Sequence, residues 1–179
     1  MVIGKLLGTS HARVYRHLAK NLGDSFMEAE IVSATGVSRS AVNLAVRDLA
    51  KSGFIDCESR GRTRFYSADP ADLVVRQFKV WETLLMLRPV VVQLHPLARR
   101  VVLYGSAAEG LDTAESDLDL FIVAPNRKSV RAVLEDTIDG RRIQAVIVSE
   151  QELAVLKSED PTFFAQIQQG LILLQDGNA

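Results

Sequence analysis

Two aspartates spaced by one residue are the strongest chemical signal in this sequence of 179 residues. Asp117 and Asp119 lie at the start of an apolar run, residues 118–123, which predicts a buried strand. Because alternate residues of a strand share a face, both carboxylates are expected on one face, about 6–7 Å apart along the strand. Like charges in an apolar surrounding repel each other, and a bound cation removes that cost. The pair therefore predicts a metal site, the alternative being ordinary surface acids at a strand edge.

The metal expected at these carboxylates is Mg²⁺ (or Mn²⁺), which prefers oxygen ligands and combines one or two carboxylates with substrate phosphates and water. Gly105 and Ser106 offer the complementary half of a phosphate site. They follow an apolar run, residues 101–104, that predicts a second buried strand. A glycine turn followed by a helix, expected over residues 107–109, presents backbone N–H groups and a hydroxyl to phosphate oxygens. Phosphate binding is therefore expected to be shared between a turn and a metal.

The pattern Gly-Ser, ten residues and then Asp-x-Asp resembles the signature of the DNA polymerase β-like nucleotidyltransferase superfamily, and more narrowly that of its minimal nucleotidyltransferases. The resemblance covers residues 90–177 and implies a small mixed sheet flanked by helices. It implies that Gly105 and Ser106 bind a nucleoside triphosphate, for which ATP is expected. It also implies that Asp117 and Asp119 are catalytic and bind the metal. The implied reaction transfers a nucleoside monophosphate to a hydroxyl, with a partner protein such as a toxin as one acceptor, and releases pyrophosphate.

One position departs from this family pattern. The resemblance implies a third carboxylate on the next core strand, predicted over residues 141–148, but the aligned position holds Gln144. A glutamine can offer its carbonyl oxygen to a metal, yet it cannot act as a carboxylate base. Asp139 and Glu150 flank the strand and are candidates to replace the acid. Two functions therefore stay open, an active transferase and a catalytically weak or inactive nucleotide-sensing transcriptional regulator.

The first part of the chain predicts a helix, a sharp turn, a second helix and a hairpin. Gly36 suits the turn because glycine tolerates a positive φ, and Ser38 is the expected N-cap of the second helix. Apolar residues at spacings of three and four leave polar residues and arginines on the outer face of that helix, and further arginines surround the hairpin tip. The predicted DNA contacts are Arg39, Ser40, Asn43, Arg47, Arg60, Arg62 and Arg64.

This order of elements resembles the winged helix-turn-helix of bacterial and archaeal transcription regulators, over residues 10–68. In that family the second helix enters the major groove of double-stranded DNA, and the wing touches the backbone or the minor groove. The alternative is a module for protein docking or dimerisation whose arginines form a solvated face. The combination of two helices with a basic hairpin favours double-stranded DNA as the partner.

A long helix is expected to connect the two parts. It starts at Asp69-Pro70, because proline is tolerated in a first turn, and its apolar pattern runs to residue 87, before Pro89. The apolar residues form two adjacent stripes, a face too wide for a helix that lies on one small domain. We therefore predict that the helix bridges the domains and packs against a second copy in a homodimer. The stripes are Val74, Phe78, Trp81 and Leu85, and Leu73, Val80, Leu84 and Leu87.

Composition and charge complete these expectations. No apolar run approaches the roughly 18 residues of a membrane span, and the single cysteine, Cys57, fits a reducing compartment, so a cytoplasmic protein without a membrane partner is expected. Residues 1–70 hold ten Lys/Arg and seven Asp/Glu, which makes them basic, whereas the remainder is acidic. This asymmetry suits one part that meets phosphates directly and one that meets them through a cation. Arg141 and Arg142 are interpreted as surface cations.

The sequence thus predicts an α+β protein in three parts. Residues 1–69 are expected to form a winged helix-turn-helix DNA-binding domain. Residues 70–89 are expected to form the connecting helix and a dimer interface. Residues 90–179 are expected to form a minimal nucleotidyltransferase domain with the polymerase β-like fold.

Overall fold

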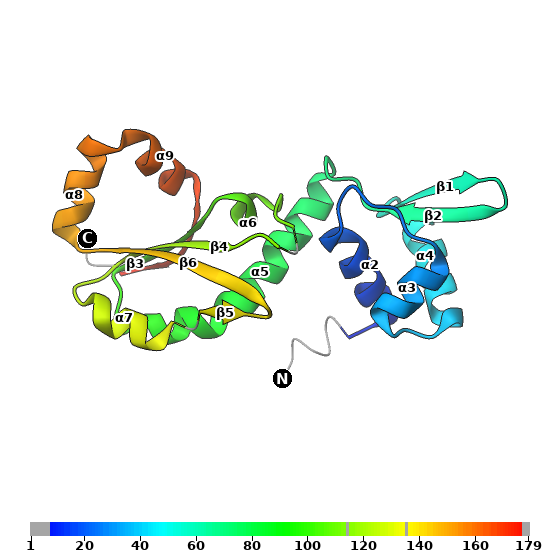
Figure 1. The fold of residues 1–179 in the computed structure, drawn as a ribbon, viewed down its shortest axis with the longest axis horizontal. Helices are drawn as coiled ribbons and strands as arrows, with labels where there is room; N and C mark the ends of the chain where they lie inside the picture. Colours follow the sequence, from blue (N-terminus) through cyan, green and yellow to red (C-terminus); the bar gives the residue numbers. More distant parts are fainter. Residues whose placement is uncertain (1–7, 114, 135, 177–179) are drawn as a thin grey trace. The chain divides into compact units, whose positions relative to one another are not determined.

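A computed structural model of the chain describes residues 8–113, 115–134 and 136–176 (Figure 1). The chain divides into two units, Met1–Lys79 and Val80–Ala179. The division falls inside a helix, α5 (Leu73–Leu94), rather than in a loop. Within the described residues, no helix combines the length and the hydrophobicity needed to cross a bilayer.

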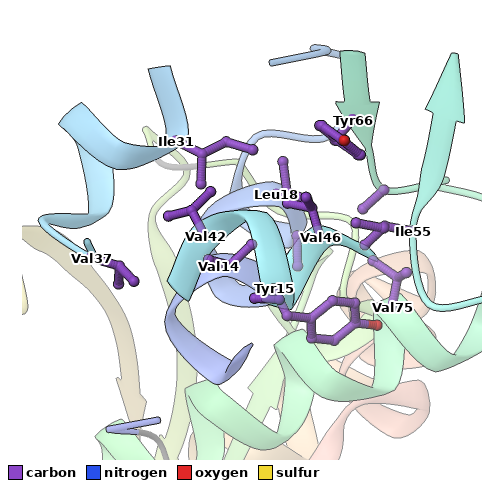
Figure 2. Close-up of a cluster of buried hydrophobic side chains, with 13 residues drawn as sticks. Val14, Tyr15, Leu18, Ile31, Val37, Val42, Val46, Ile55, Tyr66 and Val75 are labelled. Atoms are coloured by element: carbon purple, nitrogen blue, oxygen red, sulfur yellow. The ribbon is translucent and has the colours of Figure 1, made fainter. Parts of the chain in front are cut away.

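The first unit consists of helices followed by a two-stranded antiparallel hairpin. Its elements before α5 are α2 (Ser10–Lys20), α3 (Glu28–Thr35), α4 (Arg39–Lys51), β1 (Asp56–Arg60) and β2 (Thr63–Ser67). Apolar side chains from α2, α3, α4 and β2 meet in one core, to which the first residues of α5 also contribute (Figure 2). The largest fully buried members of this core include Leu18, Ile31 and Tyr66.

Local sequence signals explain the connections of this unit. Gly36 ends α3 in the left-handed region, at φ 63°, and its N–H donates to the carbonyl of Val32. The Ser38 side chain accepts the N–H of Ala41 and so caps α4. Gly61, at φ 64°, stands in the two-residue turn between β1 and β2. The turn, N-cap and hairpin expected from the sequence are confirmed.

The second unit is built on a five-stranded mixed sheet with the order β5-β6-β4-β3-β7. Strand β4 pairs in parallel with β6, and the other described pairs are antiparallel. A mixed sheet flanked by helices is therefore confirmed. Its elements are β3 (Arg100–Tyr104), α6 (Ser106–Glu109), β4 (Leu118–Val123), α7 (Arg127–Val133), β5 (Thr137–Ile138), β6 (Arg141–Val148), α8 (Glu150–Glu159), α9 (Pro161–Gln169) and β7 (Leu171–Gln175).

Helices cover both faces of this sheet. Residues of α5 and α7 pack on the face that holds Leu118, Leu120 and Ile122, whereas α8 and α9 pack on the face that holds Phe121 and Val123. Figure 1 shows α8 and α9 on the side of the sheet opposite to α7. Because strand residues alternate, Asp119 belongs to the face of Phe121. Asp119 therefore lies at the start of β4, on the sheet face that α8 and α9 cover near the end of the strand.

Helix α5 continues through Pro89 to Leu94, so the expectation that it ends before Pro89 is wrong. A proline inside a helix costs about 3 kcal/mol, because it removes a hydrogen bond and crowds the preceding turn. Leu87, Val90 and Leu94 are at most 5% exposed and belong to the core of the second unit. Burying a side chain of this size stabilises by about 1.5–3 kcal/mol, so the three together outweigh the cost of the proline.

Candidate functional site

The Gly105 turn and Asp119 lie directly against each other. Strands β3 and β4 pair so that Tyr104 is opposite Asp119, which brings the residue after Tyr104 to the carboxylate. Gly105 has φ 70° and ψ −160°, a conformation that side-chain-bearing residues rarely adopt. A Cβ atom at this position would lie 2.7 Å from Asp119 Oδ2. Glycine is therefore required here both by its backbone conformation and by the close approach of the carboxylate.

Ser106 is the first residue of α6, so this helix begins one residue before the expected range. Its side chain is half-buried, and its carbonyl accepts the N–H of Leu111. The helix is a single turn that ends at Gly110. The structure thus places Ser106 immediately after the glycine that contacts Asp119, while its binding to phosphate stays a prediction.

Asp117 lies just before β4 and is held by an arginine. Arg142 Nε is 3.1 and 3.2 Å from the two carboxylate oxygens of Asp117, and Nη2 is 2.5 Å from Oδ2. The hydrogen bonds and charge of Arg142 lower the pKa of Asp117. The Arg142 side chain is 68% exposed, so its interpretation as a surface cation is correct, although the sequence did not indicate its ion pair.

Asp119 has its pKa shifted in the opposite direction. Partial burial is the main cause that raises the pKa of Asp119, the charge of Asp117 raises it further, and Arg141 opposes both. A raised pKa means that the surroundings disfavour the ionised carboxylate. A bound cation would reverse this effect, because it favours the ionised form.

Gln144 lies in register with Asp119 on the parallel strand β6. It is exposed, and by strand alternation it shares a face with Arg142. Glu150 begins α8, beyond the far end of β6, six residues or about 20 Å along the chain from Gln144. Asp139 lies in the turn between β5 and β6, at φ 49°. Gln144 thus occupies the register position beside Asp119, whereas Asp139 and Glu150 lie beyond the two ends of β6.

Arg141 is mostly buried, so its interpretation as a surface cation is wrong. Its side chain is 11% exposed, and its Nη1 is 2.8 Å from Oδ2 of Asp112, which is 7% exposed. Arg141 Nε donates to the carbonyl of Ser116 at 3.0 Å, and Nη2 donates to the carbonyl of Asp117 at 3.3 Å. One arginine therefore ties the loop before β4 to the start of β6. It fixes the backbone that carries Asp117.

The sequence contained a signal for this arginine. The apolar residues Ile143 and Ala145 alternate with polar ones in β6 and pack in the core of the second unit. Arg141 has the same parity as these apolar residues, which places it on the inner face. Its partner, Asp112, is distant along the chain and lies in a loop without a periodic pattern. The ion pair itself could therefore not be predicted from the sequence.

The donor set fits a single Mg²⁺ ion. Among residues 8–113, 115–134 and 136–176, no group of three or more His, Cys, Asp or Glu side chains could hold a metal. Asp117 and Asp119 are two carboxylates, and Gln144 adds a carbonyl oxygen on the neighbouring strand. Mg²⁺ is commonly held by one or two protein carboxylates, with substrate phosphates and water completing its coordination. The residues present therefore suit an ion that arrives with a phosphate ligand.

The predicted DNA contacts on α4 differ in exposure. Arg39, Ser40 and Arg47 are exposed, whereas Asn43 is half-buried. Asn43 Nδ2 donates to both carboxylate oxygens of Glu28 at 3.1 Å, and Arg47 Nη2 donates to Asn43 Oδ1 at 2.9 Å. Both ends of the Asn43 amide are thus engaged within the protein, and the amide positions Arg47 on the outer face of α4.

The three hairpin arginines have different surroundings. Arg60 pairs with Glu58 at 2.7 Å and lies over the ring of Phe65, 4.7 Å from its centroid. Arg64 Nη2 is 3.8 Å from Glu28 Oε1. Arg62 is exposed in the turn. The hairpin therefore presents one arginine at its tip and two along its strands.

The second unit is similar in sequence to a known protein family. Residues 84–163 match the family model described as nucleotidyltransferase domain. This range contains the Gly105 turn, both aspartates and Gln144. No curated protein sequence matches the chain.

Several solved structures match parts of the chain at low sequence identity and low TM-score. A predicted DNA-binding transcriptional regulator from E. coli is 19% identical, with a TM-score of 0.33, and the match covers 43% of this chain and 78% of that one. AF1382 from Archaeoglobus fulgidus is 21% identical, with a TM-score of 0.39, over 46% of this chain and 94% of that one. TrmBL2, an archaeal chromatin protein, is 18% identical, with a TM-score of 0.33, over 90% and 75%. The second unit therefore resembles a nucleotidyltransferase domain over residues 84–163, the range that holds the site residues.

Proposed function

We propose that this protein is a DNA-binding nucleotidyltransferase. Its second unit binds a nucleoside triphosphate, which we expect to be ATP, together with Mg²⁺, and transfers a nucleoside monophosphate to a hydroxyl with release of pyrophosphate. The observation that carries this proposal is the close contact between Gly105 and Asp119. A Cβ atom added to Gly105 would lie 2.7 Å from Oδ2 of Asp119. A turn suited to phosphate and a carboxylate suited to a metal are thereby joined at one point.

Each residue has a distinct part in this proposal. Gly105 allows the chain to turn close to Asp119, and Ser106 offers its hydroxyl and backbone N–H to phosphate oxygens. Asp117 and Asp119 would hold the metal, with Arg141 fixing the backbone at Asp117. When bound, Mg²⁺ would neutralise negative charge on the phosphates, which is the main requirement of phosphoryl-transfer chemistry.

A second candidate function is a nucleotide-sensing transcriptional regulator with weak or absent turnover. The observation that favours it is the register of β6, which places Gln144 rather than an acid beside Asp119. A neutral amide cannot accept the proton of an attacking hydroxyl as a carboxylate does. Nucleotide binding would then change DNA binding without any transfer.

The first unit is proposed to bind double-stranded DNA as a winged helix-turn-helix. Helix α4, capped by Ser38 and exposing Arg39 and Arg47, would enter the major groove. The hairpin would touch the DNA backbone with Arg62 at its tip.

If the second unit is a transferase, we propose that the acceptor hydroxyl belongs to a partner protein, with a toxin as one candidate.

Incubation of the full chain with α-³²P-labelled ATP, Mg²⁺ and candidate acceptors separates the two functions. Transfer by the wild type, lost in Asp119→Asn and retained in the exposed control Glu159→Gln, would support the transferase. Nucleotide binding without transfer, with transfer gained in Gln144→Glu, would support the regulator. If the wild type binds no nucleotide by equilibrium dialysis, both functions are excluded.

DNA binding is tested by its dependence on salt. Each lost phosphate contact should make the fall of log K with log salt less steep, by about 1 in the slope. We expect this result, together with weaker binding of a duplex, for Arg39→Ala and for Arg47→Ala. Arg131→Ala, an exposed arginine of α7 in the second unit, should leave the slope unchanged. Unchanged slopes for both α4 variants would exclude this helix as the DNA-binding surface.

A further inference from the structure

A permanent positive charge lies beside one of the two carboxylates. Arg142 contacts both oxygens of Asp117, through Nε at 3.1 and 3.2 Å and through Nη2 at 2.5 Å. A guanidinium stays protonated in proteins and matches a carboxylate in this two-point geometry. Asp117 is therefore already neutralised by a side chain of the same chain, at the position where it would otherwise bind a metal with its full charge.

The face around this pair carries little negative charge. Alternation along β4 and β6, together with their register, gives it four polar side chains: Asp117, Asp119, Arg142 and Gln144. Nearby, Arg141 and Asp112 form an ion pair of their own at 2.8 Å. The two carboxylates and the one guanidinium among these four side chains sum to a formal charge of −1.

A charge of this size limits the number of cations. Two divalent ions in a two-metal site lie about 3.5–4 Å apart and repel each other strongly, so such sites surround them with anionic oxygens. Here both oxygens of Asp117 are engaged by Arg142, and Gln144 contributes only a neutral carbonyl. Asp119, packed against the Gly105 turn, is the carboxylate that remains for a metal.

We propose that the site binds one divalent cation, on Asp119, and that the Arg142 guanidinium takes the place of a second cation beside the triphosphate. This inference rests on the nucleotide binding proposed above. An arginine can fulfil such a role because its five N–H donors match phosphate oxygens as well as they match a carboxylate. This inference narrows the proposal above, because Asp117 then positions Arg142 instead of binding the metal.

Counting bound Mn²⁺ tests this inference. The full chain, saturated with the non-hydrolysable α,β-methylene ATP, is titrated with Mn²⁺, and free Mn²⁺ is followed by electron paramagnetic resonance. The wild type should bind one Mn²⁺ per chain. Arg142→Gln removes the guanidinium and releases the Asp117 carboxylate, so a second Mn²⁺ should bind to this variant. Because Arg142 is 68% exposed, the substitution should leave the fold intact, which thermal unfolding checks.

The second unit provides a matched control. Arg127, at the start of α7, forms an ion pair with Glu152 at 2.5 Å, and both side chains are about half exposed. Neither residue belongs to the site. Arg127→Gln should therefore keep the count at one. Two Mn²⁺ in the wild type, or one in both the wild type and Arg142→Gln, would overturn the inference while leaving nucleotide binding in place. If neither the analogue nor Mn²⁺ binds to any variant, the inference fails together with the proposed function.

Discussion

At the scale of single residues, the two aspartates have pKa values shifted in opposite directions, although only one residue separates them. Asp117 has a lowered pKa because Arg142 binds it, whereas burial and the charge of Asp117 raise the pKa of Asp119. The first carboxylate is thus satisfied within the protein, and the second is destabilised when ionised. A ligand that brings positive charge is expected to act mainly on Asp119.

This difference predicts opposite effects of two matched substitutions on stability without metal. A raised folded-state pKa means that Asp119 reduces stability as the pH rises above its unfolded value of 3.8. Asp119→Asn should therefore raise the melting temperature at pH 7 in EDTA, and the gain should vanish below pH 3.8. Asp117→Asn should lower the melting temperature at pH 7, because a lowered pKa stabilises above the unfolded value. Shifts of the same sign at pH 7 would contradict this assignment.

Gly105 is predicted to tolerate no side chain. In Gly105→Ala the added Cβ would meet Asp119 Oδ2 at 2.7 Å, and φ would stay at 70°. Strain of this kind costs about 1–3 kcal/mol, so we expect a lower free energy of unfolding in urea and a loss of Mn²⁺ binding through the displaced carboxylate. Gly53→Ala is a suitable control, because φ there is 74° but no atom lies within 4 Å. Equal Mn²⁺ affinity of Gly105→Ala and the wild type would show that the contact does not matter.

At the scale of elements, strand β6 has one end in the hydrophobic core and the other end beside the two aspartates. In β6 the residues from Val146 to Val148 lie in the core, whereas Arg142 and Gln144 are exposed. Helix α8 follows the core end of this strand, and its start therefore determines how the strand is anchored. The capping bonds of that helix, at Ser149 and Glu152, lie at the end of β6 away from Arg142 and Gln144.

The start of α8 gives a pH-dependent prediction. Glu152 accepts the N–H of Ser149 at 2.7 Å and its hydroxyl at 2.9 Å, and these bonds, followed by that from Arg127, lower the pKa of Glu152. Its contribution to stability is present above the ordinary value of 4.5 and is lost as the pH falls through the lowered pKa. Thermal unfolding should show Glu152→Gln to be less stable at pH 7, with the difference closing in acid. Glu159→Gln, at the other end of α8, should show no such closure.

The elements also show which parts of the fold the sequence could predict. The strands around Gly105 and Asp119 follow from short apolar runs that end at special residues, and both signals are local. Helix α5 was expected to stop at Pro89, because the cost of proline is local while the compensating burial of Leu94 depends on the sheet. Asn43 was expected to face outward, and its bond to Glu28 depends on how α3 and α4 pack. Long-range contacts therefore account for each difference.

At the scale of the whole molecule, the homodimer expected through residues 70–89 stays a prediction, which we extend from Leu84 and Leu85 of α5 to strand β7. An apolar groove of about 460 Å³ lies between α5 and β7 and is lined largely by aliphatic side chains. Val92 and Ile172 on its walls are 66% and 52% exposed, and strand β7 is at the edge of the sheet. Exposed apolar surface next to the edge strand of a sheet is typical of an interface.

Sedimentation velocity at micromolar concentration should therefore show a dimer. Val92→Glu should shift the protein to monomer, because it places a charge in the groove. Val155→Glu, a substitution at an apolar residue that is 49% exposed on α8, should leave the dimer unchanged. A wild type that sediments only as a monomer would refute this prediction.

The parallel register of β4 and β6 has an evolutionary consequence. Because Gln144 stands directly beside Asp119, the identity of one residue decides whether this face carries two acids or three. Codons for glutamine and glutamate differ by a single base, so one point mutation separates the two compositions. A single nucleotide change therefore supplies or removes the third acid of this face while the register of the two strands stays the same.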